Sequence, residues 1–348
     1  GLIEEVASNV PRLDYSDGGC PSLLLEPQRT NLNTFSDPTD AQKDSTSYNL
    51  VTYQDNYSWG LGDVINNAIV FGDNSTTRYA YYNSTVVSGT EYTLSVIVKM
   101  DDNSVPIPST DFLFILGGSS APFVNGYNIE DYGNNIYRVS ASATADVSST
   151  ANGILKVASN STKGFKISAF QIEQGSYATS FIKSVGTTQT RTADTATGSG
   201  SSTVINSSEG VLYFEGSALA NDGTNRTITI NDGSITNYIL IRLDSISNRI
   251  TAFNYVGGVL QCDLGFTVAN AIDIHKIAFK WKVNDFALWV DGVEVAIDSA
   301  GATYDANTLN QLSFDITAGI LPFYGKTKDL RVYTTALSDL ELTNLTKI

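Results

Sequence analysis

Short stretches of alternating apolar and polar residues run through the chain, separated by glycine, asparagine, aspartate and serine. In residues 92–100, YTLSVIVKM, alternate side chains from Tyr92 to Val98 fall on one face, which is typical of a half-buried strand. The first half has no segment with helical periodicity. The alternation predicts further strands there at residues 64–71, 78–84, 112–118, 136–144, 154–159 and 165–175. We therefore expect an all-β sandwich or jelly roll in this half.

A stretch almost free of large apolar side chains interrupts this pattern at residues 183–208. It is rich in threonine, serine and glycine, which is the composition of a linker, so we place a domain boundary near Thr192. Turns at Asn284-Asp285 and Asp291-Gly292 predict three consecutive antiparallel strands. All strands predicted after the boundary lie at 210–218, 226–233, 238–244, 249–258, 274–283, 286–296, 311–316 and 323–334. The prediction is two tandem β-sandwich domains, residues 1–191 and 192–348.

Only the end of the chain has the pattern of a helix. Ser338 is suited to cap it, and Glu341 three residues later completes a capping box. Leu337, Leu340 and Leu345 share one stripe of such a helix. A short C-terminal helix is expected.

Composition agrees with two domains and excludes some partners. The 348 residues exceed the size at which one hydrophobic core stops growing, roughly 250–300 residues. The chain carries 21 Lys plus Arg against 36 Asp plus Glu, a net charge of −15, which disfavours nucleic acid and anionic membranes as partners. No apolar run reaches the roughly 20 residues of a membrane span. Because the chain begins at Gly1, we expect a segment upstream of it.

The two cysteines, Cys20 and Cys262, cannot build a disulfide framework or a zinc cluster. We placed them in different domains. Two free and mostly buried thiols are therefore favoured over a single bridge between domains.

Three segments of the first half and two of the second carry a resemblance to known modules. Val10–Leu32 (VPRLDYSDGGCPSLLLEPQRTNL), Ile129–Ser140 (IEDYGNNIYRVS) and Phe170–Ile182 (FQIEQGSYATSFI), with TRTAD at residues 190–194, resemble a module that recurs in phage tail-fibre and head-fibre proteins. HKIAFKWKVNDFALWVDGVEV and PFYGKTKDLRVYTTALSDLEL resemble concanavalin A-like, or laminin G-like, sandwiches.

This resemblance implies a jelly roll like a carbohydrate-binding module, followed by a concanavalin A-like lectin sandwich. It implies a structural protein on the surface of a bacteriophage particle, in a head fibre or tail fibre that is usually a homotrimer. The partners implied are further copies of the chain, capsid or tail proteins, and glycans of the host surface. Similar modules occur in secreted bacterial polysaccharide-binding proteins, and this alternative remains open. The expected location is the virion surface or the extracellular space.

The residues argue against an enzyme. Retaining glycosidases need two carboxyl groups about 5 Å apart, and no predicted strand has an acid, spacer, acid pattern. Glu215 stands alone in YFEGS, while Asp291 and Glu294 flank a hairpin turn. His275 is the one imidazole available to a catalytic triad, and its position at the start of a strand favours a structural role.

No cofactor is expected, although calcium stays a candidate ligand because lectin sandwiches often hold it through loop oxygens. Two clusters could contribute, Asp101–Asn103 and the group of Asn221, Asp222 and Asn225. Neither has the spacing of an EF-hand loop, and turns are the ordinary use of such residues. We assign no metal ligand.

Sugar binding normally uses exposed aromatic rings. Trp59 in YSWGLGD lies among glycines and polar residues and is the best single candidate. Tyr79, Tyr81 and Tyr82 lie in RYAYYNS, so one strand face is predicted to be core and the other a platform. The remaining tryptophans are predicted to be core: Trp281 and Trp289.

One buried ion pair is also predicted. A sandwich closes its first strands against its last, which would bring Arg29 of LLLEPQRTN near Glu173 of FQIEQG. Both residues are given a structural role.

Overall fold

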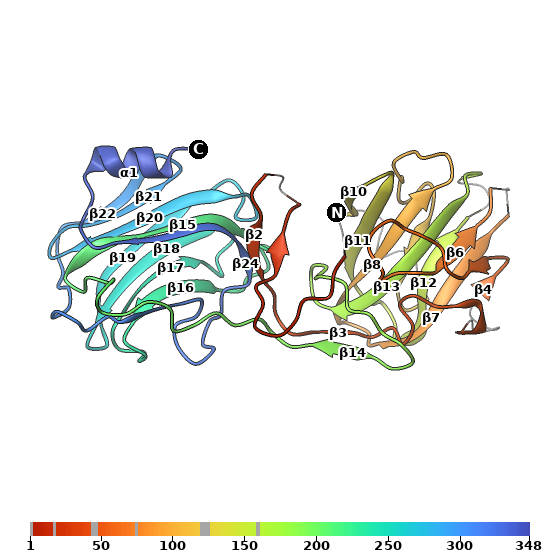
Figure 1. Cartoon of the computed structure of the whole chain (residues 1–348), viewed down its shortest axis with the longest axis horizontal. Coiled ribbons are helices and arrows are strands. Elements are labelled where there is room, and N and C mark those ends of the chain that lie inside the picture. The colour runs from red at the N-terminus through yellow and green to blue at the C-terminus, as the bar shows by residue number, and fades with distance from the viewer. Residues whose placement is uncertain (1–2, 17–18, 43–47, 74–75, 119–125, 158–160) are drawn as a thin grey trace. The chain divides into compact units, whose positions relative to one another are not determined.

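The computed structural model describes the chain except residues 1–2, 17–18, 43–47, 74–75, 119–125 and 158–160. The described part is nearly all β, with one α-helix at its end (Figure 1). It divides into two compact units. The first unit comprises residues 1–8 and 28–192, and the second comprises 9–27 and 193–348. The prediction of an all-β fold built from sandwiches is confirmed.

The first unit contains a six-stranded and a four-stranded antiparallel sheet, with the strand orders β10-β11-β8-β13-β6-β5 and β4-β7-β12-β9. A two-stranded ribbon, β14-β3, completes it. The elements of this unit are β3 (Arg29–Asn31), η1 (Asp40–Gln42), β4 (Tyr48–Asn49), β5 (Thr52–Gln54), β6 (Ala68–Phe71), β7 (Arg78–Val86), β8 (Glu91–Met100), β9 (Leu113–Ile115), β10 (Asn128–Gly133), β11 (Ile136–Thr144), β12 (Ser149–Lys156), β13 (Phe165–Gln174) and β14 (Gln189–Arg191).

The core of the first unit lies between the two larger sheets. Val96 and Val98 of β8 project into it from the six-stranded sheet, and Phe114 and Ile154 meet them from the four-stranded sheet. All four side chains are at most 1% exposed. The alternating apolar side chains of β8 therefore face the four-stranded sheet. On β7 and β12 of that sheet, the residues between the core positions face outward.

The second unit is also a two-sheet sandwich. Its sheets have the orders β1-β2-β24-β15-β20-β21-β22 and β19-β18-β17-β16-β23. Its elements are β1 (Leu13–Asp14), β2 (Ser22–Leu25), β15 (Glu209–Ala218), β16 (Arg226–Asn231), β17 (Tyr238–Leu243), β18 (Arg249–Val256), β19 (Val259–Thr267), β20 (His275–Lys282), β21 (Phe286–Val290), β22 (Val293–Asp298), β23 (Gln311–Ser313), β24 (Gly325–Tyr333) and α1 (Asp339–Thr346).

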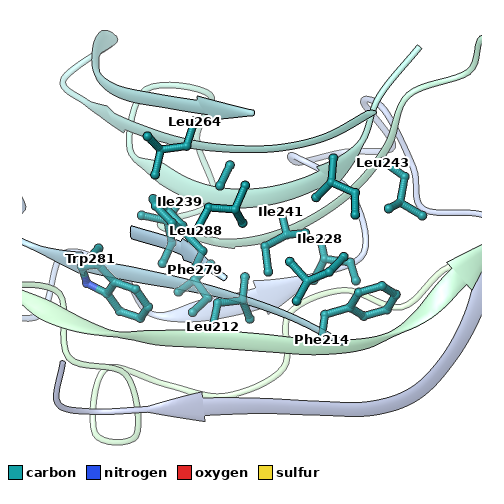
Figure 2. Packing of buried hydrophobic residues seen from close by; sticks show 14 of the residues in the cluster. Leu212, Phe214, Ile228, Ile239, Ile241, Leu243, Leu264, Phe279, Trp281 and Leu288 are labelled. Atoms are coloured by element: carbon teal, nitrogen blue, oxygen red, sulfur yellow. The ribbon is translucent and has the colours of Figure 1, made fainter. Parts of the chain in front are cut away.

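Large apolar side chains from both sheets fill the second unit. Figure 2 shows Leu212 and Phe214 on one side and Ile228, Ile239 and Ile241 on the other. Trp281 is 0% and Trp289 5% exposed, which confirms that both are core residues. The three antiparallel strands predicted around the two turns are β20, β21 and β22.

Residues 9–27 belong to the second unit, although the sequence analysis counted them in the first domain. Leu23, Leu24 and Leu25 of β2 pair with residues 327, 326 and 325 of β24. Leu25 is 5% exposed and joins the core of this unit. The run of three leucines thus adds a strand to the seven-stranded sheet, because β24 would otherwise present an unpaired edge.

The C-terminal helix packs on the outer face of the seven-stranded sheet. The Ser338 hydroxyl and backbone N–H both donate to the Glu341 carboxylate, at 2.6 and 2.8 Å. Leu342 is fully buried against Trp289, whereas Leu340 is 71% exposed. The capped helix is as predicted, but Leu342 takes the buried position expected for Leu340.

Cys20 and Cys262 are both free thiols, as expected. Cys262 is buried, and burial raises the pKa of its thiol to about 12. Cys20 is exposed, contrary to the expectation that both would be mostly buried. Both lie in the second unit. No helix in the described part of the chain has the length and apolar character needed to cross a membrane.

Candidate functional site

Trp59 is a core residue of the first unit and not an open stacking surface. Its side chain is 3% exposed and packs with Ile97 and Ile136 on the outer face of the six-stranded sheet. The indole N–H donates to the Asn67 carbonyl oxygen at 2.9 Å, and the edge of Tyr57 covers the ring at a centroid distance of 5.0 Å. The Trp59 ring is therefore packed inside the protein, and its N–H already has a hydrogen-bond acceptor.

Tyr82 is also a core residue. It is 8% exposed and its ring stacks on Phe170 with centroids 4.1 Å apart. Burial raises the pKa of its hydroxyl well above the ordinary value, and nearby Tyr53 and Asp37 add to the shift. The hydroxyl oxygen is buried and has no hydrogen-bond partner among the described residues.

Tyr82→Phe is therefore expected to be neutral or to stabilise the first unit by up to about 1 kcal/mol. The substitution removes a buried polar group that makes no hydrogen bond and keeps the stacked ring. Urea unfolding of both proteins checks it. A loss of more than 1 kcal/mol would show that the hydroxyl is hydrogen-bonded, for example to an internal water.

Tyr79 and Tyr81 lie on the outward face of β7, on the other side of the strand from Tyr82. Both are half-buried, and their rings stack with centroids 4.6 Å apart and planes 19° apart. Burial and the neighbouring Tyr79 raise the pKa of Tyr81. The structure thus separates the three tyrosines into one core residue and one surface pair.

The strand beside this pair leaves room for it. Tyr81 lies opposite Gly153 of β12, and Tyr79 lies opposite Leu155. A Cβ added to Gly153 would fall 2.9 Å from the Tyr81 Cα, so the two backbones approach closely here. Leu155 and Leu113 are half-buried and continue the same face onto β9. Tyr79, Tyr81, Leu155 and Leu113 thus form an aromatic and apolar strip with two phenol hydroxyls, which we name the Tyr79–Tyr81 platform.

Arg29 and Glu173 both lie at the 173–179 turn, and the ion pair predicted between them stays a prediction. The Arg29 guanidinium lies 5.2 Å from the ring centroid of Tyr177 and donates to the Gln28 carbonyl at 3.2 Å. The Glu173 carboxylate is 1% exposed. Among its donors are the Thr179 backbone N–H (2.5 Å), the Thr179 hydroxyl (2.7 Å) and the Gln171 side-chain amide (2.9 Å).

A second aromatic cluster, whose Tyr238 is 8% exposed, was not predicted from the sequence. Tyr238 of β17 and Tyr255 of β18 lie opposite each other on the outer face of the five-stranded sheet, with centroids 4.8 Å apart. Phe253 lies beside them, and the Arg242 guanidinium lies 4.6 Å from its ring centroid. Burial, and then Tyr255, raise the pKa of Tyr238 to about 12. The two tyrosines belong to separate predicted strands, so only the strand register brings them together.

The structure also brings together two acids, Glu215, which stood alone in the sequence, and Asp329, which was not a candidate. Glu215 of β15 lies opposite Asp329 of β24, in a groove of about 480 Å³ beside α1. The Tyr213 hydroxyl donates to Glu215 at 3.0 Å, and Arg331 pairs with Asp329 at 2.5 Å. Burial and the Glu215 charge raise the pKa of Tyr213. Each carboxylate therefore has a fixed donor of its own.

His275 is held on both sides of its ring. Nδ1 lies 2.7 Å from the Asp291 carboxylate, and Nε2 lies 3.0 Å from the Asn270 carbonyl oxygen. A carbonyl oxygen only accepts, so Nε2 has no free lone pair directed at a nucleophile. The expectation that this histidine ring is hydrogen-bonded is confirmed.

The acids considered for calcium are already engaged. Each is paired to a basic side chain at 2.5–3.1 Å: Asp101 to Lys166, Asp102 to Lys163 and Asp222 to Arg226. Hydrogen bonds from Ser104, and then Lys163, lower the pKa of Asp102 to about 2. The described residues contain no group of three or more His, Cys, Asp or Glu suited to a metal ion.

No protein-family model and no curated protein matches the chain. Solved structures do. The carbohydrate-binding module CBM40 of the Ruminococcus gnavus IT-sialidase, bound to α2,3-sialyllactose, is 16% identical, covers 43% of this chain and 94% of its own, and has a TM-score of 0.37. CBM66 of Bacillus subtilis is 10% identical, covers 37% of this chain and 76% of its own, and has a TM-score of 0.28. Sheep galectin-11 in complex with glycerol is 7% identical, covers 41% of this chain and 99% of its own, and has a TM-score of 0.29. These neighbours are carbohydrate-binding modules and lectin-like proteins.

Proposed function

We propose that this chain is a non-catalytic glycan-binding protein and that the Tyr79–Tyr81 platform contacts the sugar. The observation that carries the proposal is the stacked, half-buried tyrosine pair on the outward face of the four-stranded sheet. Stacked rings on a strand are already ordered, so binding costs little side-chain entropy. The ring faces that do not contact each other suit the apolar side of a pyranose, and the hydroxyls suit its polar edge.

The β7–β12 pairing supports this role. Seven residue pairs hold the two strands together, from Arg78↔Lys156 to Val86↔Ser149. The residues next to Tyr79 and Tyr81, Ala80 and Tyr82, are anchored in the core. The core contacts of Ala80 and Tyr82 therefore hold the backbone of the platform in place. A binding site that selects one ring geometry requires such rigid support.

We further propose that the protein is displayed on a bacteriophage particle as part of a head or tail fibre. The support is the resemblance of residues 10–32, 129–140 and 170–182 to modules of such fibres. The acidic net charge of −15 suits a surface that must not adhere to nucleic acid. The alternative is a secreted bacterial polysaccharide-binding protein. A trimer in size-exclusion chromatography with mass measurement favours the fibre, and a monomer with tight binding to a purified polysaccharide favours the alternative.

Tyr79→Ala and Tyr81→Ala are each expected to weaken glycan binding about tenfold, because each removes one stacking ring worth about 1 kcal/mol or more. A glycan array on the full chain identifies a ligand, and calorimetry with that ligand gives the two affinities. Tyr82→Phe is the matched control, since it alters a tyrosine of the same strand that faces the core, and it should bind like the parent protein.

Two results would contradict the proposal. Unchanged affinity in both alanine variants would remove the platform from the binding site. Release of reducing sugar from a bound polysaccharide, abolished by Glu215→Gln or Asp329→Asn, would make the protein a hydrolase that acts in the groove beside α1.

A further inference from the structure

The outward face of the four-stranded sheet changes from polar to apolar across its strands. Asn49 of β4 lies opposite Tyr79 of β7, and Tyr79 in turn lies opposite Leu155 of β12. Leu113 of β9 lies opposite Leu155. Residues directly opposite each other in a sheet point to the same face. One row of side chains therefore runs from an amide, through a phenol, to two leucines.

The polar end of this row is held in a fixed orientation. All four side chains of the row are half-buried. The Asn49 side-chain N–H donates to the Thr77 carbonyl oxygen at 3.3 Å, which leaves Oδ1 of the amide to accept from a ligand. The Tyr79 ring is held by its stack on Tyr81. A ligand that lies along the row meets amide and hydroxyl groups at one end and hydrocarbon at the other.

Gly153 lies where the two halves of the face meet. It is opposite Tyr81 and two residues before Leu155 on β12, so it shares their face. The strands β7 and β12 approach too closely here to admit a Cβ, and position 153 therefore carries no side chain. A methyl group placed over Gly153 would contact the Tyr81 ring on one side and the Leu155 side chain on the other.

The four strands of this sheet contain two charged residues, and both belong to the core face. Arg78 of β7 and Lys156 of β12 lie opposite each other. Each is two residues from a core position, Ala80 and Ile154 respectively, and Lys156 is 0% exposed. The strand positions that share the face of the platform are all uncharged. A charged sugar would lose hydration on this face without gaining an ion pair.

We infer that the Tyr79–Tyr81 platform selects a neutral 6-deoxyhexose, with its C6 methyl group over Gly153 and its ring hydroxyls toward Asn49 and the phenols. This inference rests on the proposed role of the platform in glycan binding. The parent hexose carries a hydroxyl at C6, which would lose water against Leu155 without gaining a partner. An N-acetyl group also ends in a methyl, but its amide N–H and C=O would need partners on the apolar side.

The test compares methyl glycosides that differ only at C6, each pair in the same D or L series: fucose with galactose, rhamnose with mannose, and quinovose with glucose. Ligand-observed NMR titration of the full chain measures dissociation constants in the millimolar range. In at least one pair the 6-deoxy sugar should bind about fivefold more tightly than its parent hexose. The methyl glycosides of N-acetylglucosamine and glucuronic acid should bind no more tightly than the hexose.

Leu155→Thr should abolish this preference, because it removes apolar contact and supplies a hydrogen-bond partner for the C6 hydroxyl of a hexose. Leu113→Thr serves if Leu155→Thr does not fold. Val87→Thr is the matched control, since Val87 is a 52% exposed residue of the same unit outside the platform. It should keep the fivefold preference.

The outcomes separate this inference from the proposed function. Equal binding within every pair, or tighter binding of the N-acetylated or charged sugar, would overturn the choice of a 6-deoxyhexose. Loss of that binding in Tyr79→Ala would still support the platform as the glycan site. A 6-deoxy preference that persists in both Leu155→Thr and Tyr79→Ala would place the site elsewhere and overturn both. No binding of any sugar in the panel would overturn the inference and leave the proposed function to the glycan array.

Discussion

Glu173→Ala should lower the melting temperature of the first unit by about 10 °C, corresponding to about 3–5 kcal/mol of unfolding free energy. The buried Glu173 carboxylate accepts hydrogen bonds from the backbone and hydroxyl of Thr179 and from the amide of Gln171. Removing it leaves these donors unsatisfied at a position that is 1% exposed. Differential scanning calorimetry of the full chain, with the two units resolved as separate transitions, measures the effect.

Two further variants make this result specific. Glu91→Ala removes an exposed acid from β8 of the same unit and should change stability by less than about 0.5 kcal/mol. Glu173→Gln keeps one acceptor oxygen and most of the volume, so its loss should be smaller than that of the alanine variant. Glycan binding by folded Glu173→Ala should be unchanged. A normal melting temperature together with lost binding would mean that Glu173 contacts the ligand.

The surroundings of this carboxylate show which contacts the sequence predicts and which it does not. The segments containing Arg29 and Glu173 were expected to meet, and they do, because the Leu32 N–H donates to the Ile172 carbonyl oxygen at 2.8 Å. Asn31 is one side chain that joins them, because its Oδ1 accepts from the Ile172 N–H at 3.2 Å. The prediction of Arg29 rested on its charge. An amide offers both a donor and an acceptor, and that suits a buried strand junction better than a charge does.

Strand positions were predictable because alternation directly reflects which side chains reach the core. The expected strands 92–100 and 165–175 correspond to β8 (Glu91–Met100) and β13 (Phe165–Gln174). The polar strand β14 was missed, since nothing in its sequence, QTR, distinguishes it from the surrounding linker. It forms only because it pairs with β3, roughly 160 positions earlier. The assignment of β2 to the second unit depends on an equally distant partner.

Candidate site residues were predictable only where a single strand decides their position. The separation of Tyr82 from Tyr79 and Tyr81 follows from the two-residue repeat of a strand. Trp59 was wrongly expected at the surface, because its glycine-rich surroundings suggested exposure while its contacts come from β8 and β11.

Pairs formed across strands could not be found at all. Glu215 and Asp329, and Tyr238 and Tyr255, each meet through a register set by long-range pairing. Their sequence neighbourhoods contain no mark of the partner. These are also the positions where the second unit has the groove beside α1 and its second aromatic cluster.

Lys156 is a further buried charge whose role the sequence conceals, because it lies at the end of an apolar strand and resembles an ordinary solvated lysine. Its side chain is fully buried and points into the sandwich from β12. The ammonium donates to the carbonyl oxygens of Gly72 at 2.5 Å and Lys163 at 2.6 Å. Gly72 follows β6 and Lys163 precedes β13, so one cation joins the four-stranded sheet to two turns of the six-stranded sheet.

Lys156→Met should therefore lower the unfolding free energy of the first unit by about 2–4 kcal/mol, because two buried carbonyl oxygens lose their donor. The loss is smaller than the sum of the two hydrogen bonds, since methionine fills similar space without the cost of burying a charge. Lys99→Met, on a half-buried lysine of β8, is the matched control and should stay within about 0.5 kcal/mol of the parent. Urea unfolding monitored by fluorescence reports this unit through Trp59, its one tryptophan. Equal stability of Lys156→Met and the parent would mean that water or a repacked turn satisfies both carbonyls, and that the cation does not join the sheets.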